Sequence, residues 1–172
     1  MSKSSRWVAG GLCGVALLIV MTCVAAAGGF AIGRLGRDGE SHYEEGVVSR
    51  VIDGDTIELT DGRRVRCIGI YTHEIAGSDG SPECYVHEAH ARNRELVEGK
   101  TVELGRGIED KDRFSRLLRY VFVDDVFVNA QLVAEGYAYA SSFGPEHRFQ
   151  QVLTQLEHYS RLRNRGLGDA CE

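Results

Sequence analysis

The segment from Gly46 to Ile70 constrains the fold more than any other part of this 172-residue chain. From Val47 it reads VVSRVIDGDTIELTDGRRVRCIGI, and two Asp-Gly pairs, at 53–54 and 61–62, divide it into three short runs rich in Val and Ile. An Asp-Gly pair between two alternating runs is among the strongest local signals for a two-residue β-hairpin turn. The segment therefore predicts three antiparallel strands joined by tight turns.

The second Asp-Gly pair also predicts how two of these strands pair. With a turn of only two residues, Ile57 faces Arg66 and Asp55 faces Ile68. Side chains alternate along a strand, so one face of the hairpin and its continuation would carry Asp55, Ile57, Leu59, Arg64, Arg66, Ile68 and Ile70. This is the more apolar face, and we expect it to meet the core with Arg66 pointing inward.

The rest of the folded region alternates between helix and strand patterns. Helices are expected over residues 82–97, 128–135 and 146–163, the last because apolar residues recur there at helical spacing. A strand is expected at 101–105, and a hairpin over 117–128 turns at Asp124-Asp125. About five short strands with about three helices predict an α+β domain built on a small Greek-key barrel, with a five-stranded OB-fold barrel as the leading candidate.

The N-terminal part differs in composition. Residues 7–32 contain no charged residue and are rich in Val, Leu, Ala and Gly. A membrane-spanning helix needs roughly 20 apolar residues, whereas the apolar part of a signal peptide has about 7–15. We therefore expect residues 1–35 to form a membrane anchor with residues 7–32 in the bilayer, followed by a linker at 36–45 and the folded domain at 46–172.

Two locations follow from this interpretation. The amino terminus, Lys3 and Arg6 precede the apolar segment, which favours an amino terminus inside the cell and a domain outside it. The protein is then a single-pass protein of the cell membrane. The alternative is a signal peptide cleaved after the alanines at 25–27, which would make the domain a secreted protein.

The charge of the expected exported part limits its partners. All 25 acidic residues and 16 of the 20 basic residues lie from Asp38 onwards, which gives this part a formal charge of −9. Such a surface does not coat a polyanion broadly. Any contact with nucleic acid must depend on a local cluster of arginines.

Candidate functional residues gather where the third strand ends. Asp55 is expected beside this end, where the chain leaves through Tyr71, Thr72 and Glu74. Two carboxylates and a backbone carbonyl would then converge, and such oxygen ligands suit Ca²⁺, Mg²⁺ or Mn²⁺. Arg66, on an apolar strand, needs an anionic partner, either one of these carboxylates or a bound phosphate.

A second polar cluster is DKDRFSRLLRY at residues 110–120, where Asp112, Arg113, Arg116 and Arg119 lie at the junction of a loop and a strand. Charged loops of this kind are usually solvated, and the pattern alone assigns no role to this one.

Three cysteines lie in the expected exported part. Cys67 falls within a strand pattern and is expected in the core. In an oxidising compartment, a Cys84–Cys171 disulfide would attach the C-terminal tail to the body of the domain. The sequence alone does not determine this connectivity.

Five segments in order and spacing resemble the staphylococcal nuclease (thermonuclease) family. They read VIDGDTIEL, RVRCIGIYTHEI, YVHEAHARNRELVEGKTVEL, DRFSRLLRYVFV and VNAQLVAEGYA, and the resemblance covers roughly Gly46 to Cys171. Five motifs in register are far more specific than any one of them. The resemblance implies an OB-fold barrel with three helices and Ca²⁺-dependent hydrolysis of DNA and RNA. We expect the domain to act as a monomer.

The resemblance also implies a role for individual residues. Asp55 matches a calcium-binding aspartate, and Thr72 matches the threonine whose carbonyl binds the metal. Glu74 matches the catalytic glutamate, which orients or deprotonates the attacking water. Arg66 and Arg116 match two catalytic arginines, which stabilise the extra charge on the five-coordinate phosphorus. The remaining assignment is a substrate-binding aromatic residue that stacks on a nucleotide base, Phe143.

The segment at the end of the third strand departs from the family pattern at two positions, Tyr71 and His73. The family has Asp-Thr-Pro-Glu where this chain has Tyr71-Thr72-His73-Glu74, so a neutral phenol replaces a second metal-binding aspartate. The site then either turns over with weaker metal binding, or is compensated by His73 or Asp53, in which case a softer metal than calcium could bind. Mn²⁺ and Mg²⁺ are the alternatives to Ca²⁺. A third alternative is a domain that binds nucleic acid or a partner without cleaving. The presence of all three catalytic side chains favours an enzyme.

Overall fold

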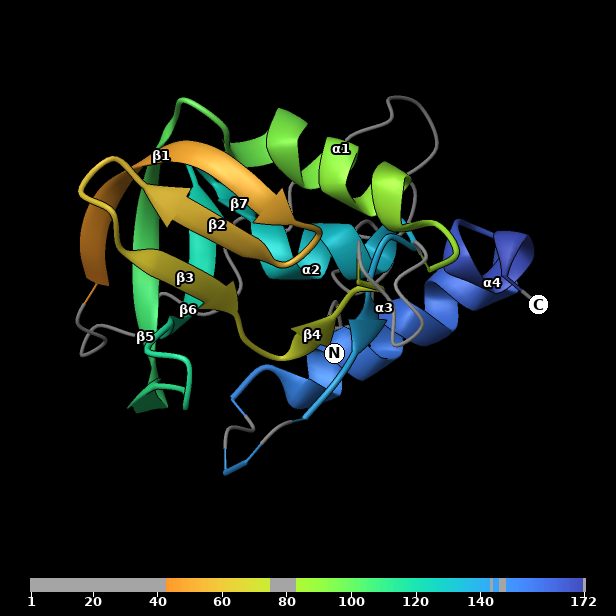
Figure 1. The fold of residues 1–172 in the computed structure, drawn as a ribbon. Coiled ribbons are helices and arrows are strands. Elements are labelled where there is room, and N and C mark those ends of the chain that lie inside the picture. Colours follow the sequence, from red (N-terminus) through yellow and green to blue (C-terminus); the bar gives the residue numbers. More distant parts are fainter. Residues whose placement is uncertain (1–42, 75–82, 143, 146–147, 172) are drawn as a thin grey trace, which may run out of the picture. The chain divides into compact units, whose positions relative to one another are not determined.

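The computed structural model describes residues 43–74, 83–142, 144–145 and 148–171 (Figure 1). The expected anchor at 1–35, most of the linker and Phe143 lie outside these residues. Within the described ranges, no helix is both long and apolar enough to cross a membrane. The first strand begins at Tyr43, three residues before the expected start of the folded domain.

Five strands form a closed barrel, as the sequence predicts. They are β1 (Tyr43–Asp53), β2 (Thr56–Leu59), β3 (Arg64–Cys67), β5 (Thr101–Lys111) and β6 (Leu117–Val123). Neighbouring strands follow the order β3-β2-β1-β5-β6, and a parallel pairing between β3 and β6 closes the barrel. The described residues also include three two-residue strands, β4 (Ile70–Tyr71), β7 (Val126–Phe127) and β8 (Tyr139–Ala140).

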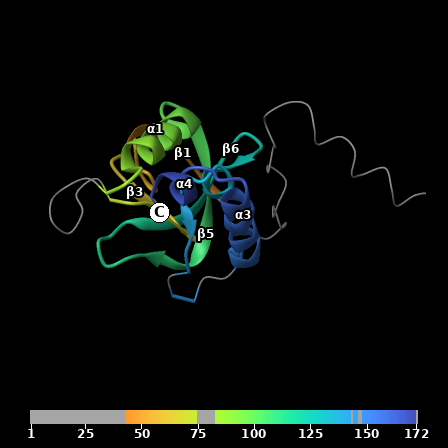
Figure 2. The same ribbon diagram turned by 90° about the vertical axis from the view of Figure 1, so that its right-hand side faces the viewer.

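In the described part of the chain, four helices accompany the barrel, one more than the three expected there. They are α1 (Val86–Val97), α2 (Val128–Ala134), α3 (Gln150–Leu162) and the short α4 (Leu167–Ala170). Helix α1 packs on β1, and α2 packs on both α3 and β6. Figures 1 and 2 show α1 and α3 on different sides of the barrel. The aromatic rings of Tyr120, Phe127 and Phe149 contact one another in the core beneath them.

The hairpin between β2 and β3 differs from the predicted register by one residue. The backbone N–H of Leu59 donates to the carbonyl of Arg63 at 2.9 Å, so residues 60–62 form a three-residue turn, with Gly62 at φ 84°. Ile57 therefore pairs with Val65, and the prediction that it faces Arg66 is wrong. A glycine with positive φ at the end of a three-residue turn is a common hairpin geometry.

This register changes which side chains share a face. The buried face of the hairpin consists of Ile57, Leu59, Val65 and Cys67, each at most 1% exposed. Arg64 and Arg66 belong to the other face, so the prediction that Arg66 points toward the core with Ile57 is also wrong. A slip of one residue exchanges the two faces of a strand, and this register removes two arginines from the core face.

The C-terminal tail is attached to the start of α1. Cys84 and Cys171 form a disulfide, with their Cα atoms 5.9 Å apart. Cys67 is a free thiol inside the core, as the strand pattern suggested. The disulfide therefore connects the residue just after α4 to the segment that leads into α1.

Candidate active site

The turn between β1 and β2 forms the centre of the candidate site. Its backbone is held by Asn93, whose side-chain amide donates to the carbonyl of Gly54 at 3.1 Å. A Cβ atom on Gly54 would lie only 2.7–2.8 Å from side-chain atoms of Thr72, so glycine allows the two segments to meet. The turn also places Asp53 close to Asp55, whose backbone N–H donates to an Asp53 carboxylate oxygen at 3.2 Å.

Asp55 is almost fully buried, at 1% exposure, and has three partners. One carboxylate oxygen accepts the hydroxyl of Thr56 at 3.1 Å, and the other accepts the backbone N–H of Thr72 at 3.0 Å. Its third partner is the guanidinium of Arg66, in an ion pair. Because Asp55 lies in the turn and not within a strand, it meets Arg66 although the expected strand register is wrong.

Arg66 leaves β3 at the edge of the barrel, away from the core face. Its side chain is 12% exposed, and a second guanidinium nitrogen lies 3.4 Å from the carbonyl oxygen of Ile70. Burial lowers the pKa of Arg66, while the negative charges of Asp53 and Glu74 raise it. The positively charged guanidinium of Arg66 therefore lies close to the carboxylates of Asp53, Asp55 and Glu74.

Arg116 approaches the same turn from the loop between β5 and β6. Asp112 organises this loop, because one of its oxygens accepts the backbone N–H groups of Phe114 and Arg116, at 2.9 and 3.0 Å. The other oxygen accepts Nε of Arg116 at 2.7 Å, and Nη1 of Arg116 lies 3.5 Å from the Thr56 hydroxyl. The two guanidinium groups consequently reach consecutive residues, Arg66 at Asp55 in the turn and Arg116 at Thr56 at the start of β2.

Glu74 follows β4 and interacts with the turn electrostatically. Burial raises the pKa of Glu74, and the charge of Asp53 raises it further, while Arg66 and Arg116 oppose both effects. Burial likewise raises the pKa of Asp53, against the charges of the same two arginines. The guanidinium groups of Arg66 and Arg116 thus lie close enough to oppose the rise in pKa of both carboxylates.

Tyr71, at the end of β4, hydrogen-bonds to a carboxylate beyond the predicted site. Its hydroxyl donates to Oε2 of Glu83 at 3.4 Å, and the same oxygen accepts the backbone N–H of Glu74 at 2.9 Å. Burial, together with the charges of Glu83 and Glu74, raises the pKa of Tyr71. The phenol therefore stays neutral at neutral pH and acts as a hydrogen-bond donor.

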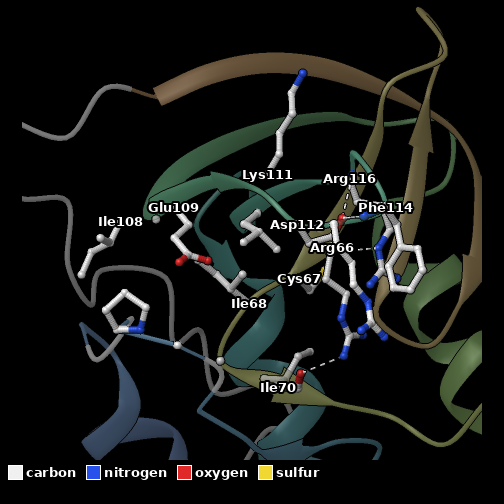
Figure 3. Close-up of a pocket in the computed structure, with 16 residues that line it drawn as sticks. Arg66, Cys67, Ile68, Ile70, Ile108, Glu109, Lys111, Asp112, Phe114 and Arg116 are labelled. Carbon is white, nitrogen blue, oxygen red and sulfur yellow. Dashed lines mark hydrogen bonds and ion pairs between the residues drawn. The ribbon is translucent and has the colours of Figure 1, made fainter.

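A cavity of about 460 Å³ opens beside the two arginines. Figure 3 shows Arg66 and Arg116 at one side of it, with Ile68, Ile108 and Glu109 around the other side. Phe114 also lines it and is 63% exposed. The guanidinium groups of Arg113 and Arg116 lie 4.7 and 5.4 Å from the centre of the Phe114 ring. A cavity of this size suits a small organic ligand, and its charged end suits an anionic one.

The oxygen atoms around the turn are of the chemical kind that binds hard divalent cations. Asp53, Asp55, Glu74 and the carbonyl of Thr72 are all oxygen donors, the kind that Ca²⁺, Mg²⁺ and Mn²⁺ prefer. Burial and then the charge of Asp53 raise the pKa of Glu74, and a bound cation would offset the second of these effects. Among the described residues, no three His, Cys, Asp or Glu side chains are grouped closely enough to form a ready metal centre.

The structure brings together most of the residues that the sequence singles out. Asp55, Arg66, Thr72, Glu74 and Arg116 surround one turn, and Cys84 and Cys171 are bonded; the substrate-binding candidate Phe143 lies outside the described residues.

Three further residues of the site carried no assignment from the sequence. Asp112 orients Arg116. The only hint of this pair in the sequence was the spacing of four residues between the two opposite charges. Phe114 lies between two arginines of the same loop. Glu83, twelve residues after Tyr71, had no local signal.

Comparisons with known proteins identify the family of the chain. Residues 64–168 match the family model described as "Staphylococcal nuclease homologue". The thermonuclease of Staphylococcus hyicus is 31% identical over 148 residues, which cover 83% of this chain and 86% of that protein. The thermonuclease of Staphylococcus intermedius is 34% identical over 122 residues, covering 69% and 70%. Endonuclease YncB of Bacillus subtilis (strain 168) is 36% identical over 95 residues, covering 53% and 45%. The chain therefore belongs to the staphylococcal nuclease family and is a nuclease.

Proposed function

We propose that the domain hydrolyses phosphodiester bonds in DNA or RNA as a monomer, with a divalent cation held by Asp55 and the carbonyl of Thr72. Ca²⁺ is the first candidate, with Mn²⁺ and Mg²⁺ as alternatives. The observation that carries this proposal is the convergence of Arg66 and Arg116 on Asp55 and Thr56. The two guanidinium groups could bind the anionic phosphate, and the buried carboxylate of Asp55 beside them could bind the metal cation.

The bound cation would offset the negative charge by which a phosphodiester repels nucleophiles. Glu74 would hold the attacking water and accept its proton, and the raised pKa of Glu74 makes it a stronger base than an exposed carboxylate. Arg66 and Arg116 would stabilise the charge that develops on the phosphoryl oxygens. Because Asp112 fixes Arg116 through two hydrogen bonds, little reorientation would be needed during the reaction.

Tyr71 is the reason to expect weaker cation binding. Its hydroxyl is neutral and donates to Glu83, so it contributes no negative charge. Of the two candidates for compensation, His73 has its Nδ1 atom against the carbonyl of Cys84. Asp53 is the last residue of β1, directly before the central turn, and its charge acts on Glu74, so we favour Asp53 as the compensating carboxylate.

The presence of Tyr71 in place of an aspartate also supports a second candidate function. If the loss of one acidic ligand abolishes cation binding, the arginines and the cavity remain, and the domain would bind nucleic acid without cleaving it.

Nuclease assays on the full-length chain distinguish the two. Single-stranded DNA, plasmid DNA and RNA are incubated with Ca²⁺, Mn²⁺, Mg²⁺ or EDTA. We expect cation-dependent cleavage that Glu74→Gln lowers by about a hundredfold, a typical contribution of a general base. Tyr71→Asp should lower the half-saturating cation concentration by about tenfold, because it restores a charged ligand. Binding of DNA with no cleavage under any cation would support the binding domain instead.

We also propose that the domain acts outside the cytoplasm, either anchored by residues 7–32 or secreted after cleavage near residue 27. The Cys84–Cys171 bond supports this, since structural disulfides persist in oxidising compartments. Proteolysis of intact cells tests it, because an anchored external domain would be digested without lysis.

A further inference from the structure

We infer that Glu83 is a positioning residue for the nuclease reaction, which holds the backbone of Glu74 in place and takes this role together with Tyr71. The inference rests on the proposed function, since it assigns a role at the same site.

The contacts between Glu83 and Glu74 run in both directions. The Glu83 carboxylate accepts the backbone N–H of Glu74 at 2.9 Å, and the backbone N–H of Glu83 donates to the carbonyl of Glu74 at 3.3 Å. A hydrogen bond from an amide to a carboxylate is stronger than one between neutral groups. These two bonds hold the peptide groups on both sides of the Glu74 side chain.

Tyr71 also donates a hydrogen bond to the Glu83 carboxylate and helps to fix its orientation. Its hydroxyl donates to Oε2, the same oxygen that accepts the Glu74 N–H. An aspartate at position 71 would repel Glu83, whereas the tyrosine donates to it. Tyr71, which departs from the family pattern, therefore gives Glu83 a partner within the site.

Neighbouring contacts hold Glu83 itself. The next residue, Cys84, is bonded to Cys171, and its carbonyl oxygen accepts a hydrogen bond from Nδ1 of His73. Residues 71–74 and 83–84 are thus joined by contacts at Tyr71, His73 and Glu74. The backbone that carries Glu74 is anchored through Cys84 to the C-terminal tail.

Three substitutions of Glu83 distinguish the effect of where the acceptor oxygen lies from the effect of its negative charge. Glu83→Ala removes the acceptor, and Glu83→Asp keeps the charge but withdraws the oxygen by one methylene. Glu83→Gln loses the charge but keeps an oxygen at the right distance. Glu88→Ala is the matched control, because Glu88 is an exposed glutamate in the first turn of α1.

The first readout is amide hydrogen exchange at Glu74, followed by NMR on the ¹⁵N-labelled full-length chain. It needs neither cation nor substrate. In Glu83→Ala and Glu83→Asp, exchange at Glu74 should accelerate about ten- to hundredfold, as expected for loss of a hydrogen bond to a charged group. Amides in α1 should keep their wild-type rates, which shows that the fold is intact.

The second readout is steady-state cleavage of a single-stranded oligonucleotide. We expect Glu83→Ala and Glu83→Asp to lower kcat by about tenfold with KM within about twofold, because a displaced base affects the transition state more than binding. Glu83→Gln should retain most of kcat, and Glu88→Ala should match wild type.

The outcomes are distinguishable. Wild-type kcat in both Glu83→Ala and Glu83→Asp, or a change in KM alone, would overturn the inference. Equal loss in Glu83→Gln would overturn it too, since charge and not position would then matter. If Glu74→Gln lowers the rate but Glu83→Ala does not, only the inference fails. If Glu74→Gln leaves the rate unchanged, the proposed function fails and the inference fails with it.

Discussion

Removing the disulfide with Cys84→Ser/Cys171→Ser should destabilise the domain strongly. The bond closes a loop between residues 87 positions apart, and it encloses every helix of the described chain. The loss of chain entropy in an unfolded state with a loop of this length corresponds to about 4–5 kcal/mol at 25 °C. Domains of this size have a total stability of about 5–15 kcal/mol, so the change is a large part of it.

The folded state of the variant should remain close to that of the native domain. The tail is also held by a backbone hydrogen bond from Leu167 to Gly136, at 2.9 Å, and Leu167 is buried. Most of the effect should therefore arise in the unfolded chain. Without the bond that chain is less compact, which exposes more surface on unfolding and raises the denaturant m-value.

Urea denaturation of the wild-type and double-variant chains, followed by far-ultraviolet circular dichroism, measures both quantities. We expect a lower free energy of unfolding and a higher m-value in the variant, and wild type treated with a reducing agent should reproduce both. A double variant within about 1 kcal/mol of wild type, with the same m-value, would refute the reasoning, because it would mean that the bond does not restrict the unfolded chain.

Two further predictions concern the turn and the acid stability. Gly54→Ala should lower nuclease activity by about tenfold or more, since its Cβ would displace Thr72; Gly62→Ala, with nothing within 4 Å but a positive φ, should cost stability and leave the rate unchanged. Hydrogen bonds from Arg119 and Arg63 outweigh burial and keep the pKa of Glu44 below its usual range. Its contribution to stability is therefore complete above the unfolded-state pKa, near 4.3, and is lost as pH falls through the lower folded-state pKa. Urea titrations between pH 6 and 3 should show this loss, and Glu44→Gln should reduce the slope; stability that rises on acidification would contradict it.

The barrel could be predicted because its signals are local. Short β-branched runs and Asp-Gly turns mark the first three strands, and the predicted helices at 82–97, 128–135 and 146–163 overlap α1, α2 and α3. The turn length could not be derived from Asp-Gly alone. In the structure the Asp61 carboxylate accepts the backbone N–H and Nε of Arg63, at 3.0 and 2.7 Å, which stabilises a longer turn.

The burial pattern of β3 contained the information that the turn signal lacked. In the predicted register two arginines would face the core, and in the observed register Val65 and Cys67 do. Burying an apolar side chain such as Val is worth about 1.5–3 kcal/mol, whereas a charge in the core is costly without a partner. The hydrophobic alternation of β3 should therefore outweigh a preference between turn types.

The candidate site illustrates a different limit of sequence reasoning. The sequence could point to Asp55 and Glu74, because they flank predicted strands, and to Arg66, because it is a charge within an apolar strand, although their roles came from the family resemblance. It could not show that Tyr71 and Glu74 share one oxygen of Glu83, since that contact spans a connection with no strand or helix pattern. The replacement of an aspartate at position 71 therefore looked like a simple loss of charge. In three dimensions Tyr71 donates to the Glu83 carboxylate, which also holds the backbone of Glu74. The effect of the tyrosine on activity therefore depends on which factor limits the rate, the placement of Glu74 or the affinity for the cation.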